Sequence, residues 1–165
     1  MIKIAIFASS LNMSAIKEIL TPANWEATPN KEKLFSGDHV IDAYIKGKSD
    51  GIKDLKEQLK TKINKNLNLA GANTNQLINY LKKKGFHPKS AYLKINSLDD
   101  FLVLVILPEA EFLSPEILPV YKYISTLEKK ASPHYRLKFS IYDVQDDINV
   151  HALNSDGFNL RHKTL

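Results

Sequence analysis

The stretch Phe101-Leu-Val-Leu-Val-Ile-Leu107 is apolar at every position. A strand of this kind is buried on both faces, so another layer of structure is expected to cover each side. It is followed by Ser114-Pro115-Glu116, which supplies a helix N-cap, a proline for the first helical position and an acid for the first turn. The sequence therefore predicts a strand over 101–107 and a helix over 115–131.

Two further strands are predicted on either side of this unit. Residues 91–96 and 135–144 alternate between apolar and polar side chains, which is typical of half-buried strands. A strand, a helix and a second strand in this order form a crossover unit, whose two strands are parallel. We therefore expect 101–107 and 135–144 to run side by side in the same direction.

The N-terminal half has the spacing of helices. Apolar residues recur at three- and four-residue steps between 40 and 67, where glycines at 47 and 51 predict a break or a bend. Residues 68–72 are expected to form a loop. Asn73 and the residue three positions on have the spacing of a capping box, which opens a helix that runs to residue 84. Gly85 fits the left-handed position that ends such a helix.

These elements predict an α+β fold with a mixed or antiparallel sheet of about five strands. The helix over about 115–131 is expected on one face and the N-terminal helices on the other, because 101–107 needs cover on both sides. We expect a single domain over 1–165. Its helix-rich half, about 1–86, and its strand-rich half, about 87–165, would share one core, with Trp25 as an anchor in the connection before the helices.

Composition excludes several classes of protein. The 165 residues contain no cysteine, which excludes disulfides and thiolate metal sites. No stretch approaches the ~20 apolar residues that span a bilayer, and the short apolar run over 2–8 is interpreted as a strand and not a leader. Ser9-Ser10 after it lacks the glycines of a nucleotide-binding loop. We therefore expect a cytoplasmic protein without cofactor or membrane partner.

Charge is concentrated in the middle of the chain. Residues 51–96 hold ten lysines and two acids, whereas 97–165 carry a net charge of −3. A basic segment of this kind indicates an acidic partner such as nucleic acid, although it is also typical of the solvated face of a helix. The candidate phosphate-binding residues are Lys53, Lys56, Lys60, Lys82, Lys83, Lys84 and Lys89.

One resemblance supports the nucleic-acid alternative. Thr74-Asn-Gln-Leu-Ile-Asn-Tyr-Leu-Lys-Lys-Lys-Gly85, followed by the strands over 91–96 and 101–107, is loosely similar to the recognition helix and wing of winged-helix proteins. The resemblance implies DNA or RNA contact through the lysines of 51–94. Against it, the segment has no arginine, and the supposed wing strand is too apolar for a solvated wing.

Two further groups of residues are candidates for chemistry. The carboxyl ends of the two parallel strands would bring Glu109, Glu111, Asp143, Asp146 and Asp147 to one edge, where clustered carboxylates suit Mg²⁺ and a phosphodiester-cleaving enzyme. The segment 149–162 is interpreted as a hairpin around Asp156-Gly157. Such a hairpin would pair His151 with His162, either as metal ligands or as neighbours of a small apolar patch.

The sequence favours a non-catalytic protein that acts as a macromolecular interaction module. Its expected partner is another protein or a second copy of the chain. Nucleic-acid binding through the lysine-rich helices is the first alternative, and a Mg²⁺-dependent phosphodiester enzyme is the second.

Overall fold

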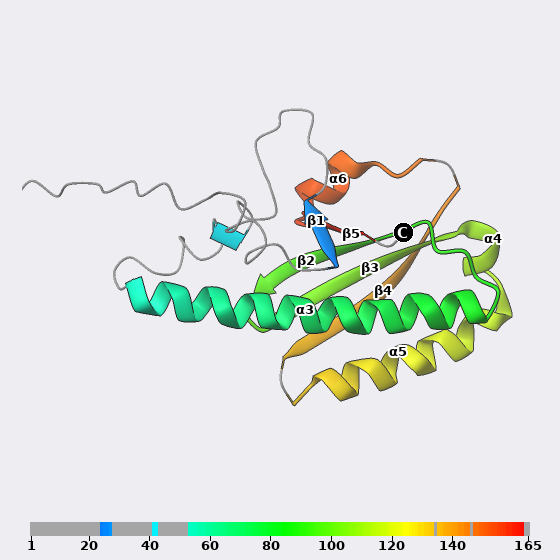
Figure 1. The fold of residues 1–165 in the computed structure, drawn as a ribbon. Coiled ribbons are helices and arrows are strands. Elements are labelled where there is room, and N and C mark those ends of the chain that lie inside the picture. Colours follow the sequence, from blue (N-terminus) through cyan, green and yellow to red (C-terminus); the bar gives the residue numbers. More distant parts are fainter. Residues whose placement is uncertain (1–23, 28–40, 43–52, 134, 146, 164–165) are drawn as a thin grey trace, which may run out of the picture.

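The computed structural model describes residues 24–27, 41–42, 53–133, 135–145 and 147–163, and the side chains of 53–56 lie outside this description. In chain order the elements are β1 (Trp25–Ala27), α3 (Lys53–Lys83), β2 (Ser90–Ser97), β3 (Asp100–Pro108), α4 (Glu109–Phe112), the 3₁₀ helix η1 (Pro115–Ile117), α5 (Leu118–Ala131), β4 (Arg136–Val144), α6 (Val150–Ser155) and β5 (Leu160–His162). The strands form one mixed sheet, so the predicted α+β class is confirmed (Figure 1). The strand predicted over 2–8, the serines after it and the break at 47–51 lie outside the described residues.

The sheet has the strand order β1-β5-β2-β3-β4. Strands β2 and β3 form an antiparallel pair, and β3 and β4 are parallel with α5 between them in the chain. The predicted parallel pairing is therefore confirmed. Among the described residues, β4 lies at one edge of the sheet and pairs with β3 alone.

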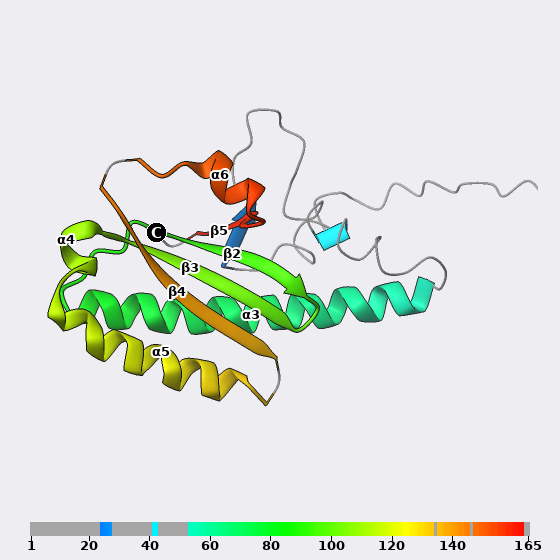
Figure 2. The ribbon, with the colours of Figure 1, turned by 180° about the vertical axis from the view of Figure 1, so that it is seen from behind.

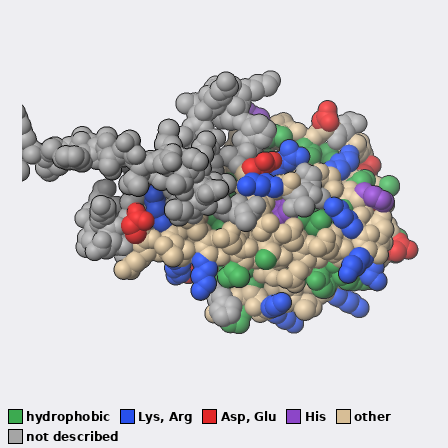
Figure 3. Space-filling view, viewed as in Figure 1, with side chains coloured by type: hydrophobic (Ala, Val, Ile, Leu, Met, Phe, Trp, Pro, Cys, Tyr) green, Lys and Arg blue, Asp and Glu red, His purple; other side chains and the backbone are tan. Residues whose placement is uncertain are grey.

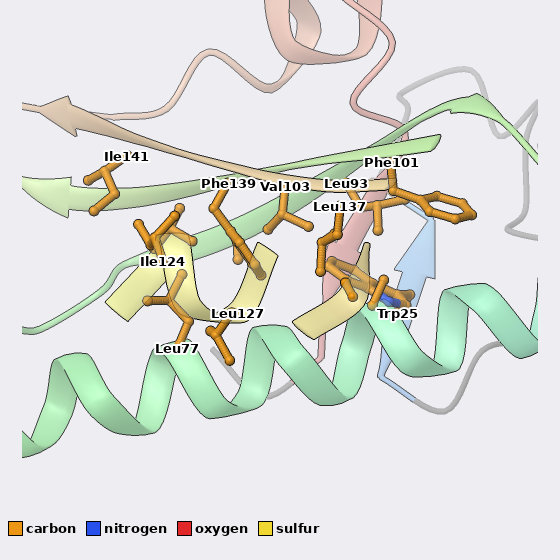
Figure 4. Close-up of a cluster of buried hydrophobic side chains, with 14 of the residues drawn as sticks. Trp25, Leu77, Leu93, Phe101, Val103, Ile124, Leu127, Leu137, Phe139 and Ile141 are labelled. Carbon is orange, nitrogen blue, oxygen red and sulfur yellow. The ribbon is translucent and has the colours of Figure 1, made fainter. Parts of the chain in front are cut away.

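Both long helices lie on the same face of the sheet, so their predicted placement on opposite faces is wrong. Phe101, Val103, Leu137 and Phe139 alternate along β3 and β4 and join side chains of α3 and α5 in one core (Figure 4). The two helices also contact each other, because the rings of Tyr80 and Tyr123 stack with centroids 4.1 Å apart. The opposite face carries the short helix α6 (Figure 2), and Leu102 and Leu104 are only half-buried there.

Helix α3 continues through the segment that was expected to be a loop. It spans 31 residues, and Asn73, the predicted cap, lies inside it and donates from Nδ2 to the hydroxyl of Tyr135 at 2.7 Å. Gly71 serves close packing rather than helix termination. A Cβ at Gly71 would stand 2.7 Å from the Cβ of Asn24, just before β1. The glycine that suggested a loop over 68–72 is therefore explained by the close contact between Gly71 and Asn24.

The end of α3 follows the prediction. Gly85 has a φ of 86°, and its amide donates to the carbonyl of Lys82 while the amide of Phe86 donates to that of Leu81. This pair of bonds is a Schellman motif, which needs a residue without Cβ strain at the left-handed position. It turns Phe86 back into the core, where it is 4% exposed.

The predicted C-terminal hairpin is wrong, because residues 150–155 form α6. Asn149 caps this helix by accepting at Oδ1 from the amide of Ala152. Gly157, with a φ of 93°, ends it through a second Schellman motif, in which the amide of Phe158 donates to Leu153. A type I′ turn and a helix C-cap both require glycine at positive φ, so Asp156-Gly157 suits either structure.

Trp25 is an anchor, as expected, and is fully buried in β1. Its indole Nε1 donates to the carbonyl of Leu67 in α3 at 3.1 Å, and its ring meets that of His162 edge-on at 5.1 Å. Strand β1 is thereby tied both to β5 and to the long helix. No helix within the described part of the chain is long and apolar enough to cross a membrane.

Candidate binding edge and groove

Within the described part of the chain, the sheet ends on one side at the nine-residue strand β4 and on the other at β1. The amide of Phe139 points away from β3, because it donates to Oε1 of Glu128 on α5 at 2.9 Å. Backbone groups along a strand alternate in direction, so the amides of Ile141 and Asp143 point out of the same edge. Glu128 therefore occupies one outward donor and leaves the stretch 141–144 as the accessible part of the edge.

Helix α5 flanks this edge. Tyr121, Ser125 and Glu128 lie four and three residues apart, so they share one stripe of the helix, and Glu128 fixes that stripe against β4. Ser125 and Glu128 also line a cleft of about 710 Å³ that runs beside the first residues of β4. Tyr121 is 42% exposed and Leu118, one turn before it, is 64% exposed. The flank is thus polar beside the start of β4 and apolar beside its end.

Two ion pairs lie in this cleft. Arg136 Nη1 lies 3.3 Å from Asp100 Oδ2, and Lys138 Nζ lies 2.8 Å from Glu128 Oε2. Both cations are largely exposed, so these pairs contribute little to stability. They are available for exchange with the charges of a partner.

A second hollow lies on the open face of the sheet, between β3, β4 and α6. Its volume is about 480 Å³. Its apolar lining comes from Leu104, Ile106, Tyr142, Val144, Ile148, Ala152, Leu153 and Phe158, and its polar lining from Asp147, Asn149 and Asp156. We call it the open-face groove. Tyr142, which belongs to the edge strand, is 61% exposed.

The candidate lysines do not gather on one surface. Lys82, Lys83, Lys84 and Lys89 are exposed at or beyond the end of α3, whereas Lys60 pairs with Asp42 at 2.9 Å. Lys53 and Lys56 lie in α3, but their side chains lie outside the described residues. Figure 3 shows Lys and Arg side chains at several places on this face, among hydrophobic and other residues.

The winged-helix interpretation is wrong. Helix α3 runs without a turn from Lys53 through residue 74, so the described residues contain no helix-turn-helix unit in which 74–84 is a separate recognition helix. The supposed wing strand, β3, is an interior strand between β2 and β4. Nucleic-acid binding by the lysines themselves stays a prediction.

The candidate carboxylates are dispersed, although the ends of β3 and β4 do meet as predicted. Glu109 accepts from Gln145 at 2.7 Å, and Glu111 accepts from the amide of His87 at 2.7 Å. Asp143 is the second-last residue of the edge strand, Asp147 lines the open-face groove and Asp146 lies outside the described residues. Among the residues that the structure describes, no three His, Asp or Glu side chains are placed to hold a metal ion.

The two candidate histidines are far from forming a pair. His151 is exposed on α6, while His162 is fully buried in β5, where its register partner is Trp25. Burial lowers the pKa of His162 from 6.5 to about 4, with a hydrogen bond to the backbone of Gly71 opposing the shift and the charge of Lys82 adding to it. His162 is therefore a neutral core residue at physiological pH.

The edge and the open-face groove were missed in the sequence. The signal available for the edge was the alternation from Arg136 to Tyr142, in which every second residue is polar or exposed. That pattern shows that one face of β4 is open, but strand order is a property of the assembled sheet. Comparisons of the chain with known protein families, with curated proteins and with solved structures gave no significant match.

Proposed function

We propose that the protein is a non-catalytic interaction module that binds an extended segment of another protein as a sixth strand beside β4. The observation that carries the proposal is the edge itself: a long terminal strand, with outward amides at 141 and 143, beside an apolar helix flank. Strand addition to an exposed sheet edge gives affinity through main-chain hydrogen bonds and specificity through alternate side chains.

Exposed apolar residues on both sides of the edge support this. Tyr121 and Leu118 lie on the helix side of an added strand, and Tyr142 lies on its open-face side. Monomeric proteins seldom leave several large apolar side chains exposed around one unprotected strand, since such a site invites pairing. These residues would contact the alternating side chains of the added strand.

The Glu128 contact favours a different protein over a second copy. Two copies that pair β4 with β4 along its whole length, around a twofold axis at its central residue Ser140, would place Phe139 opposite Ile141 of the other copy, but Glu128 already occupies the outward amide of Phe139. A short segment that pairs only with 141–144 avoids this contact. Pairing of two copies along the whole of β4 is thereby disfavoured, and the partner we propose is a short extended segment of another protein.

The experiment compares Asp143→Pro with Asp143→Ala. Both remove the same charge, but only proline removes the outward amide and blocks pairing at an edge. Phage carrying random peptides are selected on the wild type and then tested on both variants. We expect the selected peptides to bind the alanine variant like the wild type and to show no binding to the proline variant.

Equal binding to both variants, or a selection that yields no binding peptide, would contradict strand addition. Should the proline variant fail to fold, Tyr121→Arg changes an exposed side chain of the α5 flank beside 141–144 without touching the core, and we expect it to weaken peptide binding. Sedimentation of the protein alone is the companion measurement. A dimer that Asp143→Pro dissolves would mean that the added strand belongs to a second copy.

A further inference from the structure

The open-face groove lies beside the accessible end of the β4 edge. Tyr142 and Val144 belong both to the lining of the groove and to the last residues of β4. A strand added along 141–144 would send every second side chain onto the same face as Tyr142. A large side chain at that position would pass Tyr142 and reach the surface of Leu104 and Ile106.

The groove has the size and lining of a site for an apolar anchor. Its volume of about 480 Å³ and its Leu, Ile and Phe walls suit a side chain such as Phe, Trp or Leu. Buried aromatic or aliphatic anchors of this kind carry most of the affinity in many interfaces. Helix α6 forms the far wall, and the C-cap at Gly157 places Phe158 there.

The charged side chains in the lining of the groove, as far as the structure describes it, are both acidic. They are Asp147 and Asp156, while Lys94 lies against Gly157 just outside the lining. This contrasts with the cleft at the other end of β4, where Arg136 and Lys138 are present. An acidic rim around an apolar hollow favours an apolar group that has a cation next to it.

We propose that the open-face groove binds the anchor of the added strand, and that this anchor is a large apolar residue adjacent to a lysine or arginine. This inference rests on the proposed function, because the β4 edge brings the segment to the groove. The partner is thus an extended, basic-apolar protein segment.

The test is a charge swap. Random peptides on phage are selected separately on the wild type and on the double variant Asp147→Lys with Asp156→Lys, and both sets are sequenced. Wild-type peptides should carry Lys or Arg beside a large apolar residue. On the double variant the ratio of basic to acidic residues at that position should fall by about tenfold or more, the size expected for one well-placed charge pair.

A filled groove gives the second arm. Ala152→Arg places a long cation in the groove, and His151→Arg adds the same charge to the next, exposed position of α6 outside the lining. We expect wild-type peptides to bind the His151 variant normally and to bind the Ala152 variant at least about tenfold more weakly.

Amide exchange separates the two proposals. The anchor inference fails if the double variant selects the same basic residues as the wild type, or if peptides bind Ala152→Arg at full strength. If the peptide still protects the amides of Ile141 and Asp143, strand addition is retained. Binding without protection of those amides would overturn strand addition as well. A selection that enriches no basic-apolar sequence on the wild type would also reject the anchor inference.

Discussion

The two faces of the same sheet are built from alternate residues of the same strands, yet they have different roles. On the covered face, Phe101, Val103 and Leu137 are almost completely buried under α3 and α5. On the open face, Leu104 is half-buried and Tyr142 is largely exposed beside the groove. A shift of one residue along β3 therefore moves from a position that stabilises the fold to one that can contact a partner.

The difference shows that apolar residues in one strand need not all serve the core. The covered face needs close packing, because a cavity there costs free energy directly. Part of the open face keeps apolar side chains in contact with solvent, as at Leu104 and Tyr142, which is typical of interaction sites. Substitutions at these exposed positions should therefore affect stability less than substitutions on the covered face.

Truncation should separate the two faces most clearly. Phe101→Ala should lower the free energy of unfolding by about 3–5 kcal/mol, because it opens a cavity beneath α3. Leu104→Ala, on the open face, should cost about 1 kcal/mol, because that side chain is already partly in solvent. Urea unfolding followed by Trp25 fluorescence measures both. Equal losses would mean that the faces are packed alike.

Acid should weaken the covered face through His162. Its pKa is about 4 in the folded protein and 6.5 in the reference state, so only the unfolded chain takes up the proton between these values. The stabilisation is complete above pH 6.5 and is lost as pH falls to about 4, which amounts to about 3 kcal/mol. His162→Leu should flatten this pH dependence, whereas His151→Leu should leave it unchanged. If the free energy of unfolding falls equally with decreasing pH in the wild type and in His162→Leu, His162 is not the group responsible for the loss of stability in acid.

Gly85→Ala should destabilise by about 1 kcal/mol, because the left-handed backbone at this position strains any residue with a Cβ. The contact that suffers is Phe86 in the core under α3, so the effect belongs to the covered face. Thermal melts of Gly85→Ala and Gly85→Asn measure it. Asparagine tolerates this conformation and should be affected less. If the alanine variant has the same melting temperature as the wild type, the Schellman motif at Gly85 would be contradicted.

The smallest effect on stability is expected for the exposed lysines. Reversing Lys82, Lys83 and Lys84 to Glu should change stability little, since solvated charges contribute little. If nucleic acid is the partner, this change should abolish binding to labelled DNA or RNA in fluorescence anisotropy, and binding by the wild type should weaken steeply with salt. If the β4 edge is the binding surface, as we propose, selected peptides should bind the reversed variant like the wild type.

Local signals in the sequence predicted much of the fold. The cap at Ser114, the C-cap at Gly85 and the alternation along β4 are written in neighbouring residues, and all three are observed. Signals with two meanings failed. Gly71 was interpreted as part of a loop, but it makes room for Asn24, which is remote in sequence. Asp156-Gly157 was interpreted as a hairpin turn, but it ends α6.

The candidate site was harder to predict, because it depends on the assembled sheet. The residues around Arg136–Val144 do not indicate that this strand is the last one of the sheet among the described residues, or that Glu128 accepts from its outward amide at Phe139. The charged residues that are easy to see in the sequence, Glu109 and Glu111, are held by Gln145 and His87 instead of converging on a ligand. Charge and residue type therefore predicted a site at these carboxylates and did not indicate the β4 edge.

The most direct test of strand addition is amide hydrogen exchange at Phe139, Ile141 and Asp143, measured by NMR with and without a saturating selected peptide. If strand addition occurs, the amides of Ile141 and Asp143 should become strongly protected on binding, while that of Phe139, already bonded to Glu128, should change least. Protection that appears elsewhere in the protein, with the exchange of Ile141 and Asp143 unchanged, would contradict it.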